Sequence, residues 1–298
     1  MKLLKISFVA FALFIILVTG VFLVKKKYLD KPKCEVLDLW QGNPPTSNGL
    51  EGLENPVIEG VWIENVCKAE MFLYKANNKK DGRAVIICPS GAYEGLSLMY
   101  DGTAWAEWLQ SKGITAVTLK YRSANEIPEV PLEDMRQAVK YLFDNAEELK
   151  IDRNKIGFWG ASAGGHLATY AAFTAEEGFR PDFLVLFYPV VTMNDKYGSI
   201  RTRNALLGKD VTEEDIERYS VENLVTEHSP RTYIMYSDDD LESKPINGEI
   251  LRDSLLAKGV DVTLKTYPEG GHGWGTKAEF KYSKEMTASL AEWLDNLY

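Results

Sequence analysis

The stretch KIGFWGASAGGHLATYAAF, residues 155–173, reads as a strand, a sharp turn and a helix in immediate succession. Residues 155–159 form an apolar run, and the small residues around Ser162 have the spacing Gly-x-Ser-x-Gly. Such a turn lifts a serine above the edge of a sheet, and the glycines let the following helix approach the strand closely. The pattern predicts that Ser162 is a nucleophile at the start of a helix over 163–176, where the amide of Ala163 is free to bind an oxyanion.

Short apolar runs alternate with longer amphipathic segments along most of the chain. The predicted strands cover residues 61–66, 71–74, 84–88, 115–119, 155–159, 183–187, 232–236 and 262–266. The predicted helices cover residues 101–112, 132–150, 163–176, 247–258 and 277–297. Apolar strands separated by helices predict an α/β fold, with a mostly parallel central sheet and helices on both faces. We expect the first two runs to form an antiparallel hairpin at the sheet edge, and residues 35–298 to form a single domain.

A general base for Ser162 has few candidates, because the chain contains 3 histidines. His272 lies in a glycine-rich loop, GGHGWG, directly after the last predicted strand. The glycines allow an exposed loop to bring the imidazole to the serine, and the chain order serine, acid, histidine is typical of this architecture. We therefore predict His272 as the base. His166 is expected to pack within the helix after the serine, and His228 to lie in a loop before a strand.

The acid that orients the histidine should follow the predicted strand at 232–236. Three consecutive carboxylates stand there, Asp238, Asp239 and Asp240. The acid must be buried against the imidazole so that it fixes the tautomer and stabilises the imidazolium, whereas the other two would be solvated or would cap the loop. The residues alone leave all three aspartates open.

A second group of oxyanion donors is expected after the strand at 84–88, where such sheets place a donor loop. The loop sequence is Pro-Ser-Gly-Ala-Tyr. We predict that the backbone amide of Gly91 or Ala92 acts together with that of Ala163. A plain turn between strand and helix is the alternative interpretation.

The overall charge argues against one class of function. With 43 acidic and 34 basic residues the net charge is −9, and no basic face is suggested. Nucleic-acid binding depends on clustered Lys and Arg. We therefore expect no nucleic-acid partner.

The amino terminus differs from the rest of the chain, because residues 6–24 carry no charge and are flanked by lysines. A span of this length matches a bilayer core of about 30 Å. We predict an uncleaved membrane anchor at residues 5–25 within an amino-terminal segment, 1–34; a long cleaved signal leading to secretion is the alternative. The lysines after the span favour a domain inside the cell, and the short leader favours an exported one. We expect export.

Together these motifs resemble the α/β hydrolases, and more narrowly the bacterial acetyl-xylan-esterase-like, or BD-FAE-like, carbohydrate esterases. The resemblance covers nearly all of residues 38–298. It is carried by LW-G at 39–42, CPSGAYEGLS at 88–97, GITAVTLKYR at 113–122, PLEDMRQAVKYL at 131–142, IDRNKIGFWGASAGGHLA at 151–168, RPDFLVLFYPV at 180–190, ALLG at 205–208 and GGHGWG at 270–275. It implies a serine esterase that removes acetyl or similar acyl groups from small-molecule or oligosaccharide esters, without a metal or another cofactor.

The resemblance also selects among the three aspartates. In the family the acid lies seven residues before an asparagine that opens the next helix, so Asn247 points to Asp240, with Asp239 as the alternative. The chain departs from the family at residues 88–93, where CPSGAY stands in place of the usual HPGGGY. Backbone donors survive this change, but the shape of the loop should differ.

Three aromatic residues flank the predicted loops, namely Tyr93, Tyr100 and Trp274. Each could stack on a sugar ring or belong to the core. Two other functions stay open: a serine peptidase of the oligopeptidase type, which usually carries a large additional domain, and a membrane-tethered binding protein on an inactive hydrolase fold.

Overall fold

The computed structural model describes residues 34–76 and 81–298. The predicted membrane anchor at residues 5–25 lies outside them. No helix within the described ranges has both the length and the apolarity needed to cross a membrane. Residues Val36–Tyr298 form one packed unit.

Most of the described strands belong to one eight-stranded sheet. In spatial order they are β1 (Glu35–Asp38), β4 (Glu70–Tyr74), β7 (Thr115–Lys120), β5 (Ala84–Cys88), β8 (Ile156–Ala161), β9 (Phe183–Phe187), β10 (Arg231–Ser237) and β11 (Val262–Tyr267). From β7 to β11 neighbouring strands are parallel, and β4 pairs antiparallel with β7. The prediction of a mostly parallel sheet is confirmed. The loops after these parallel strands gather at one edge of the sheet, where such folds place their ligands.

The predicted edge hairpin is wrong. Its first run became β3 (Trp62–Glu64), which belongs to a separate three-stranded antiparallel sheet with β2 (Asn55–Ile58) and β6 (Gly95–Ser97). Its second run, β4, joined the large sheet instead. Two adjacent apolar runs predict strands but not their partners. Here the partner of β3 is the distant strand β6, in which Leu96 pairs with Ile63, 33 residues earlier.

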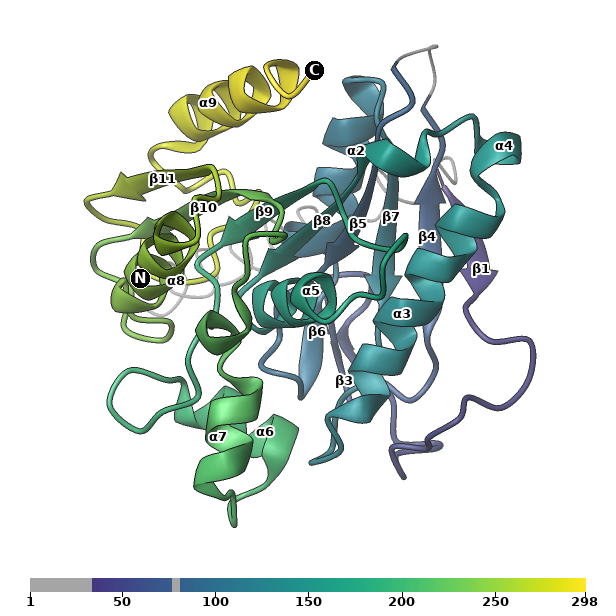
Figure 1. Cartoon of the computed structure of the whole chain (residues 1–298). Helices are drawn as coiled ribbons and strands as arrows, with labels where there is room; N and C mark the ends of the chain where they lie inside the picture. Colours follow the sequence, from purple (N-terminus) through teal and green to yellow (C-terminus); the bar gives the residue numbers. More distant parts are fainter. Residues whose placement is uncertain (1–33, 77–80) are drawn as a thin grey trace, which may run out of the picture. The chain divides into compact units, whose positions relative to one another are not determined.

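Helices cover both faces of the large sheet. Trp105 of α2 (Ala104–Ser111) contacts Phe187 of β9, and Trp293 of α9 (Ser283–Asp295) contacts Phe183 of the same strand. Side chains four positions apart on a strand share a face, so α2 and α9 cover the same side. Figure 1 shows α2 behind the sheet, with α3 (Glu129–Asp144), α5 (Ala163–Phe173) and α8 (Ile246–Ala257) in front of it. The short helix α4 (Ala146–Leu149) follows α3.

An insertion after β9 carries two helices that the sequence pattern did not predict. They are α6 (Ile200–Leu207) and α7 (Glu213–Tyr219), which lie together below the sheet in Figure 1. Both begin at a side-chain cap: Ser199 accepts from the amide of Thr202, and Thr212 and Asp215 form a reciprocal capping box. At two turns each, these helices are too short for apolar periodicity to reveal them.

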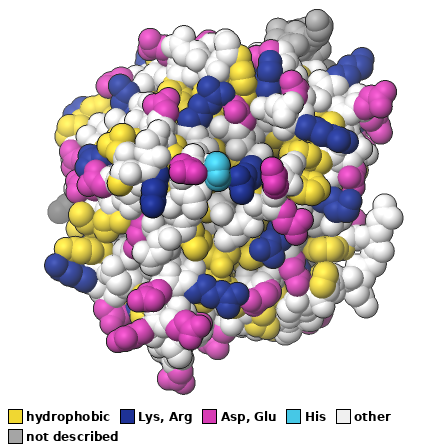
Figure 2. Space-filling model, viewed as in Figure 1, with side chains coloured by type: hydrophobic (Ala, Val, Ile, Leu, Met, Phe, Trp, Pro, Cys, Tyr) yellow, Lys and Arg dark blue, Asp and Glu magenta, His cyan; other side chains and the backbone are white. Residues whose placement is uncertain are grey.

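The surface carries both signs of charge. On the face presented in Figure 2, Lys and Arg side chains are interleaved with Asp and Glu side chains. Neither sign forms a continuous field there.

A buried ion pair ties the end of β7 to helix α3. Arg122 follows β7, and its side chain donates to Asp134 over 2.8 to 3.0 Å. The backbone amide of Arg122 and the indole of Trp40 donate to the same carboxylate, over 2.9 and 2.7 Å. Both charged side chains are almost completely buried. The pair therefore fixes the loop that leaves β7 at the carboxyl edge of the parallel strands.

Replacing one partner of this pair should destabilise the protein strongly. Asp134→Ala leaves the buried guanidinium of Arg122 without its main acceptor, and loss of one partner of a buried pair costs about 3–5 kcal/mol. The free energy of unfolding from urea titration measures this loss.

A matched control is available on the same helix. Asp144 forms an exposed i,i+4 ion pair with Lys140, and such pairs contribute about 0.3–0.5 kcal/mol. Asp144→Ala should therefore change stability very little. A loss at Asp134 as small as that at Asp144 would contradict the proposed importance of the buried pair.

Candidate active site

Ser162 occupies a strained turn between β8 and α5. Its backbone angles are φ 53° and ψ −120°, a conformation that costs a non-glycine residue roughly 1–3 kcal/mol and is concentrated at functional sites. The turn needs glycine on both sides. A β-carbon on Gly160 would lie 2.2 Å from the carbonyl oxygen of Gly164, and one on Gly164 would lie 2.1 Å from the carbonyl oxygen of Cys88.

Three predicted residues form one hydrogen-bonded row. The Nε2 atom of His272 lies 2.9 Å from Ser162 Oγ, and its Nδ1 atom lies 2.7 Å from Asp240 Oδ2. Because an ionised carboxylate only accepts, Nδ1 carries the proton, and Nε2 accepts from the serine hydroxyl. The row is therefore arranged for removal of the serine proton by the imidazole.

The structure distinguishes the three aspartates. Asp240 is fully buried, and its Oδ1 accepts from the amides of Glu242 and Ser243 over 2.9 and 3.0 Å. Asp238 and Asp239 are exposed. Asp239 accepts instead from the amide of Gly271 over 2.8 Å, and this hydrogen bond lowers the pKa of Asp239. Of the three, Asp240 is the carboxylate that contacts His272.

The predicted oxyanion donors lie on both sides of the close approach between α5 and β5. Ala163 is the first residue of α5, where amides have no intrahelical acceptor. Gly91 and Ala92 follow β5 with φ values of 147° and 54°. Within the described residues no protein group accepts a hydrogen bond from the amide of Gly91 or Ala92. These amides are available for an oxygen that develops negative charge.

Two of the three aromatic residues are buried, so the stacking hypothesis is wrong for them. Tyr93 is 1% exposed, and its hydroxyl lies 2.8 Å from Nδ1 of His166. Trp274 is 3% exposed, stacks on Phe280 with ring centroids 4.2 Å apart, and donates to Ser237 Oγ. Neither ring has a free face for a sugar. Tyr100 is partly exposed.

The two other histidines lie apart from the row. His228 is exposed, with Nε2 3.7 Å from Glu227. His166 is buried one turn after Ser162, where its Nε2 lies 2.7 Å from the carbonyl oxygen of Tyr219. A carbonyl oxygen only accepts, so Nε2 carries the proton and Nδ1 accepts from Tyr93. His166 thereby holds Tyr93 and the loop that contains Gly91 and Ala92.

Asp101 connects the loops of the site, and no local sequence pattern indicated it. It lies in a π-helix (Met99–Thr103) and is 1% exposed. Its carboxylate accepts from Ser90 Oγ over 2.5 Å and from the hydroxyl of Tyr188 over 2.6 Å. That hydroxyl accepts in turn from the amide of Gly275 over 3.0 Å, and the ring of Tyr188 packs 4.7 Å from that of His272. The carboxylate of Asp101 therefore links the donor loop, residues 89–94 after β5, to the histidine loop, residues 270–275.

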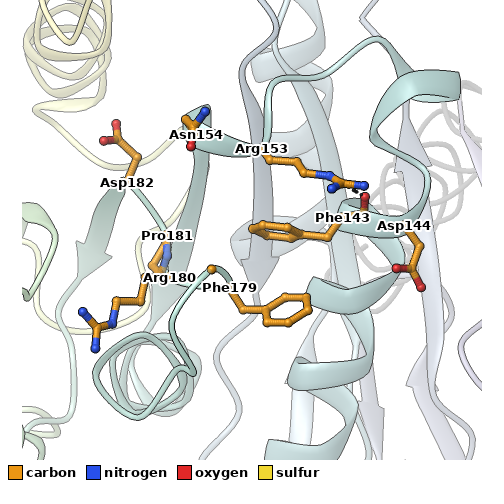
Figure 3. Close-up of a pocket in the computed structure, with 9 residues that line it drawn as sticks. Phe143, Asp144, Arg153, Asn154, Phe179, Arg180, Pro181 and Asp182 are labelled. Atoms are coloured by element: carbon orange, nitrogen blue, oxygen red, sulfur yellow. Dashed lines mark hydrogen bonds between the residues drawn. The ribbon is translucent and has the colours of Figure 1, made fainter.

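A separate hollow lies at the opposite edge of the sheet. It has a volume of about 590 Å³ and is lined by residues that precede β8 and β9. Figure 3 shows Phe143 and Phe179 side by side there, with Arg153 and Asn154 on one side. Ser162 follows the other end of β8, so this hollow is not part of the hydrogen-bonded row. In the described ranges no group of three or more His, Cys, Asp or Glu side chains is arranged to hold a metal ion.

Comparison with known proteins identifies the family of the chain. Residues 90–276 match the family described as the alpha/beta hydrolase fold. The chain belongs to this family. It is 31% identical over 234 residues to an acetylxylan esterase of Xylanibacter ruminicola, covering 77% of this chain and 48% of the relative. It is 27% identical over 251 residues to endo-1,4-beta-xylanase B of Butyrivibrio fibrisolvens, covering 75% of this chain and 39% of the relative.

Among solved structures, an acetyl ester-xyloside bifunctional hydrolase from Caldicellulosiruptor lactoaceticus superposes with a TM-score of 0.75 at 26% identity. The match covers 88% of this α/β hydrolase and 96% of the solved chain. This α/β hydrolase spans about half the length, or less, of the curated relatives named above. The resemblance to carbohydrate esterases is thereby confirmed for the region that the relatives share.

Burial of His166 predicts a specific acid sensitivity. Desolvation lowers its pKa to about 4 from an ordinary value near 6.5, although the carbonyl of Tyr219 partly opposes the shift. The unfolded chain therefore binds a proton below about pH 6.5, whereas the native protein does so only below about pH 4. This contribution is fully present above pH 6.5 and is lost as the pH falls to 4, by roughly 3 kcal/mol.

The variant His166→Gln should lose this part of the pH dependence, because glutamine does not titrate. Urea unfolding of the variant and the unaltered protein between pH 7 and 4 measures the difference. The exposed His228 provides the matched control, and His228→Gln should keep the slope of the unaltered protein. Equal slopes for His166→Gln and the unaltered protein would show that the buried histidine does not cause the effect.

Proposed function

We propose that this protein is a serine esterase that hydrolyses acyl esters, acetyl esters above all, of a carbohydrate. The observation that carries the proposal is the row from Asp240 through His272 to Ser162, together with backbone amides for which the described residues provide no acceptor. The names of the relatives, an acetylxylan esterase and an acetyl ester-xyloside hydrolase, support a sugar as the alcohol part of the ester.

The first half-reaction forms an acyl-enzyme. Ser162 Oγ attacks the ester carbonyl carbon, and His272 Nε2 takes the proton of the hydroxyl. Asp240 stabilises the resulting imidazolium through Nδ1. The carbonyl oxygen becomes an oxyanion, to which the amide of Ala163 and that of Gly91 or Ala92 donate. Collapse of the tetrahedral intermediate breaks the bond to the sugar oxygen, which leaves as an alcohol with the proton from His272.

The second half-reaction regenerates the serine. His272 removes a proton from a water molecule, and the hydroxide attacks the acyl carbon of the ester on Ser162. The same amides stabilise the second oxyanion. Collapse releases the carboxylic acid and returns the proton to Ser162 Oγ. Every proton in both steps passes through Nε2 of His272, so the orientation of this ring governs the rate.

Asp101 and Tyr188 act on that orientation without reaching the ester. Tyr188 packs against the imidazole and binds the amide of Gly275, three residues after the base. Asp101 fixes the hydroxyl of Tyr188 and, through Ser90, the loop with the second oxyanion donor. The two groups are positioning residues, and a small displacement of a reacting group can cost about 10²-fold in rate.

Ser162→Ala should lower kcat for p-nitrophenyl acetate by at least about 10³-fold, because the variant lacks the nucleophile. A fluorophosphonate probe should label the unaltered protein at Ser162 and leave the variant unlabelled. Ester hydrolysis by colorimetric assay and labelling by mass spectrometry are the measurements.

Ser111→Ala, an exposed serine at the end of α2, is the control and should keep full activity. Retained turnover in Ser162→Ala would overturn the proposal. An unaltered protein that the probe does not label would support the binding-protein function instead, and cleavage of peptide amides without cleavage of acetylated sugars would support a peptidase.

Asp101→Ala should lower kcat by about 10- to 100-fold with little change in KM, because the donor and histidine loops lose their common anchor. Asp101→Asn keeps one acceptor oxygen and should lose less. Tyr188→Phe should also lower kcat, and the double variant should lose less than the two single effects combined. Steady-state kinetics with p-nitrophenyl acetate separates kcat from KM.

The exposed Asp144, whose partner Lys140 is also exposed, offers a control for loss of negative charge, so Asp144→Ala should keep the kcat and KM of the unaltered protein. A rise in KM alone in Asp101→Ala, or additive effects in the double variant, would count against the positioning role.

A further inference from the structure

A cleft of about 260 Å³ adjoins the oxyanion loop, residues 89–94 after β5, and we propose that it binds the neutral sugar chain that carries the ester. This inference rests on the proposed esterase function. The cleft lies between Tyr93 and Glu94 of the oxyanion loop, Asn125 and Glu126 after β7, and the end of α6. Its volume is below the range of about 300–1,000 Å³ of drug-sized sites, which suits one or two sugar rings of a chain that continues into solvent.

The groups that line the cleft match the chemistry of sugar hydroxyls. Asn65 and Asn204 present carboxamides, each with an acceptor oxygen and two donor hydrogens, and Glu126 presents a carboxylate. Within the part of the chain that the structure describes, none of these three side chains has a hydrogen bond or ion pair. A hydroxyl both donates and accepts, so neighbouring hydroxyls of a sugar ring can satisfy all three.

Backbone strain is concentrated on the walls of this cleft. Among the described non-glycine residues, 8 have positive φ, and 4 of them line the cleft: Asn65, Tyr93, Asn125 and Glu126, at 52°, 62°, 47° and 65°. Three more, Ala92, Ser162 and Tyr188, belong to the catalytic site. Each such residue costs roughly 1–3 kcal/mol and persists only when its surroundings determine its conformation, as at ligand-binding sites. The residues with positive φ are therefore concentrated in the cleft and around the catalytic row.

Hydrogen bonds between distant segments hold these strained residues. The amide of Asn65 donates to the carbonyl of Glu94 over 3.1 Å, and that of Glu126 donates to the carbonyl of Ala205 over 2.9 Å. The amide of Glu94 donates to the carbonyl of Gly91 over 3.0 Å. The cleft is therefore formed before a ligand arrives, and its wall is the same turn that presents the oxyanion donors. A bound sugar would contact the loop that also carries Gly91 and Ala92.

The charges of the cleft favour a neutral ligand. Glu94 is neutralised by Arg201, whose guanidinium lies 2.6 Å from its carboxylate. Glu126 and Lys209 add one charge of each sign. The one aromatic residue of the lining, Tyr93, is 1% exposed and offers no ring face. A neutral polyhydroxyl chain bound through hydrogen bonds fits these walls better than an aromatic or an ionic group.

The test compares two substrates in a double variant, Asn65→Gly with Asn204→Ala. Glycine adopts positive φ freely, so the first change removes the amide without disturbing the turn. The ratio of kcat/KM for acetylated xylo-oligosaccharide to that for p-nitrophenyl acetate should fall about tenfold, since two side chains lose their hydrogen bonds to the sugar. Thermal unfolding checks that the variant is folded.

Asn154→Ala serves as the matched control, because Asn154 is an exposed amide in the hollow of Figure 3 at the opposite edge. Its ratio should equal that of the unaltered protein. A ratio within twofold in the double variant, with Ser162-dependent hydrolysis of both substrates, would overturn the cleft and leave the esterase function standing. A fall in the ratio for Asn154→Ala alone would assign the sugar to the other hollow and also overturn the cleft.

A binding measurement separates the cleft from the chemistry. Ser162→Ala protein should bind unesterified xylo-oligosaccharide in an NMR titration, and adding the two cleft substitutions should raise Kd about tenfold. If the unaltered protein hydrolyses neither ester, the proposed function fails, and this titration still decides the cleft. Equal Kd values with and without the cleft substitutions, or absence of binding, would overturn it.

Discussion

The conformation of the turn at Ser162 depends on the close approach of helix α5 to the end of strand β5. This approach is possible only because residue 164 is a glycine and has no side chain. A β-carbon there would meet the carbonyl oxygens of Cys88 and Pro89 at 2.1 and 2.3 Å. This approach brings the first amide of α5 next to the end of β5, where Gly91 and Ala92 follow. The positions of Ser162 and of the amides that we propose as oxyanion donors therefore depend on one contact. If α5 moved outward, the serine would lose its strained geometry and the amides would separate.

Asp240 and His272 reach Ser162 because they follow parallel strands of the same sheet. Strands β8, β9, β10 and β11 are neighbours, so the loops after them end at the same edge. Asp240 follows β10 and His272 follows β11, and the row spans 110 residues of sequence between Ser162 and His272. The apolar runs, the Gly-x-Ser-x-Gly turn and the glycine-rich loop around His272 are local patterns, and they predicted which strand each of the three groups would follow. The order of neighbouring strands was not predicted, because it does not follow the order along the chain.

Other features depend on contacts that no local pattern encodes. Tyr93 and Trp274 flank the loops in sequence, yet partners 73 and 37 residues away bury them. Asp101 accepts a hydrogen bond from Tyr188, which lies 87 residues downstream. The three consecutive aspartates are locally equivalent, and only the resemblance favoured Asp240. The turn after β10, in which the amide of Asp240 donates to the carbonyl of Ser237, directs the third one inward and leaves the first two exposed.

The residues with positive φ at the carboxyl edge of the sheet are held in place by buried side chains directly behind them. Asn125 and Glu126, both in the left-handed region, follow Arg122 by three and four residues. The guanidinium of Arg122 is held on Asp134 in the core, so the chain leaves β7 from a fixed point. In the same way, Ala92 and Tyr93 are held by His166, which is anchored on Tyr219. Where the family that the sequence resembles usually has Gly-Gly-Gly, residues 90–92 are Ser-Gly-Ala: Ser90 binds Asp101, and the buried supports offset the cost of a β-carbon at Ala92.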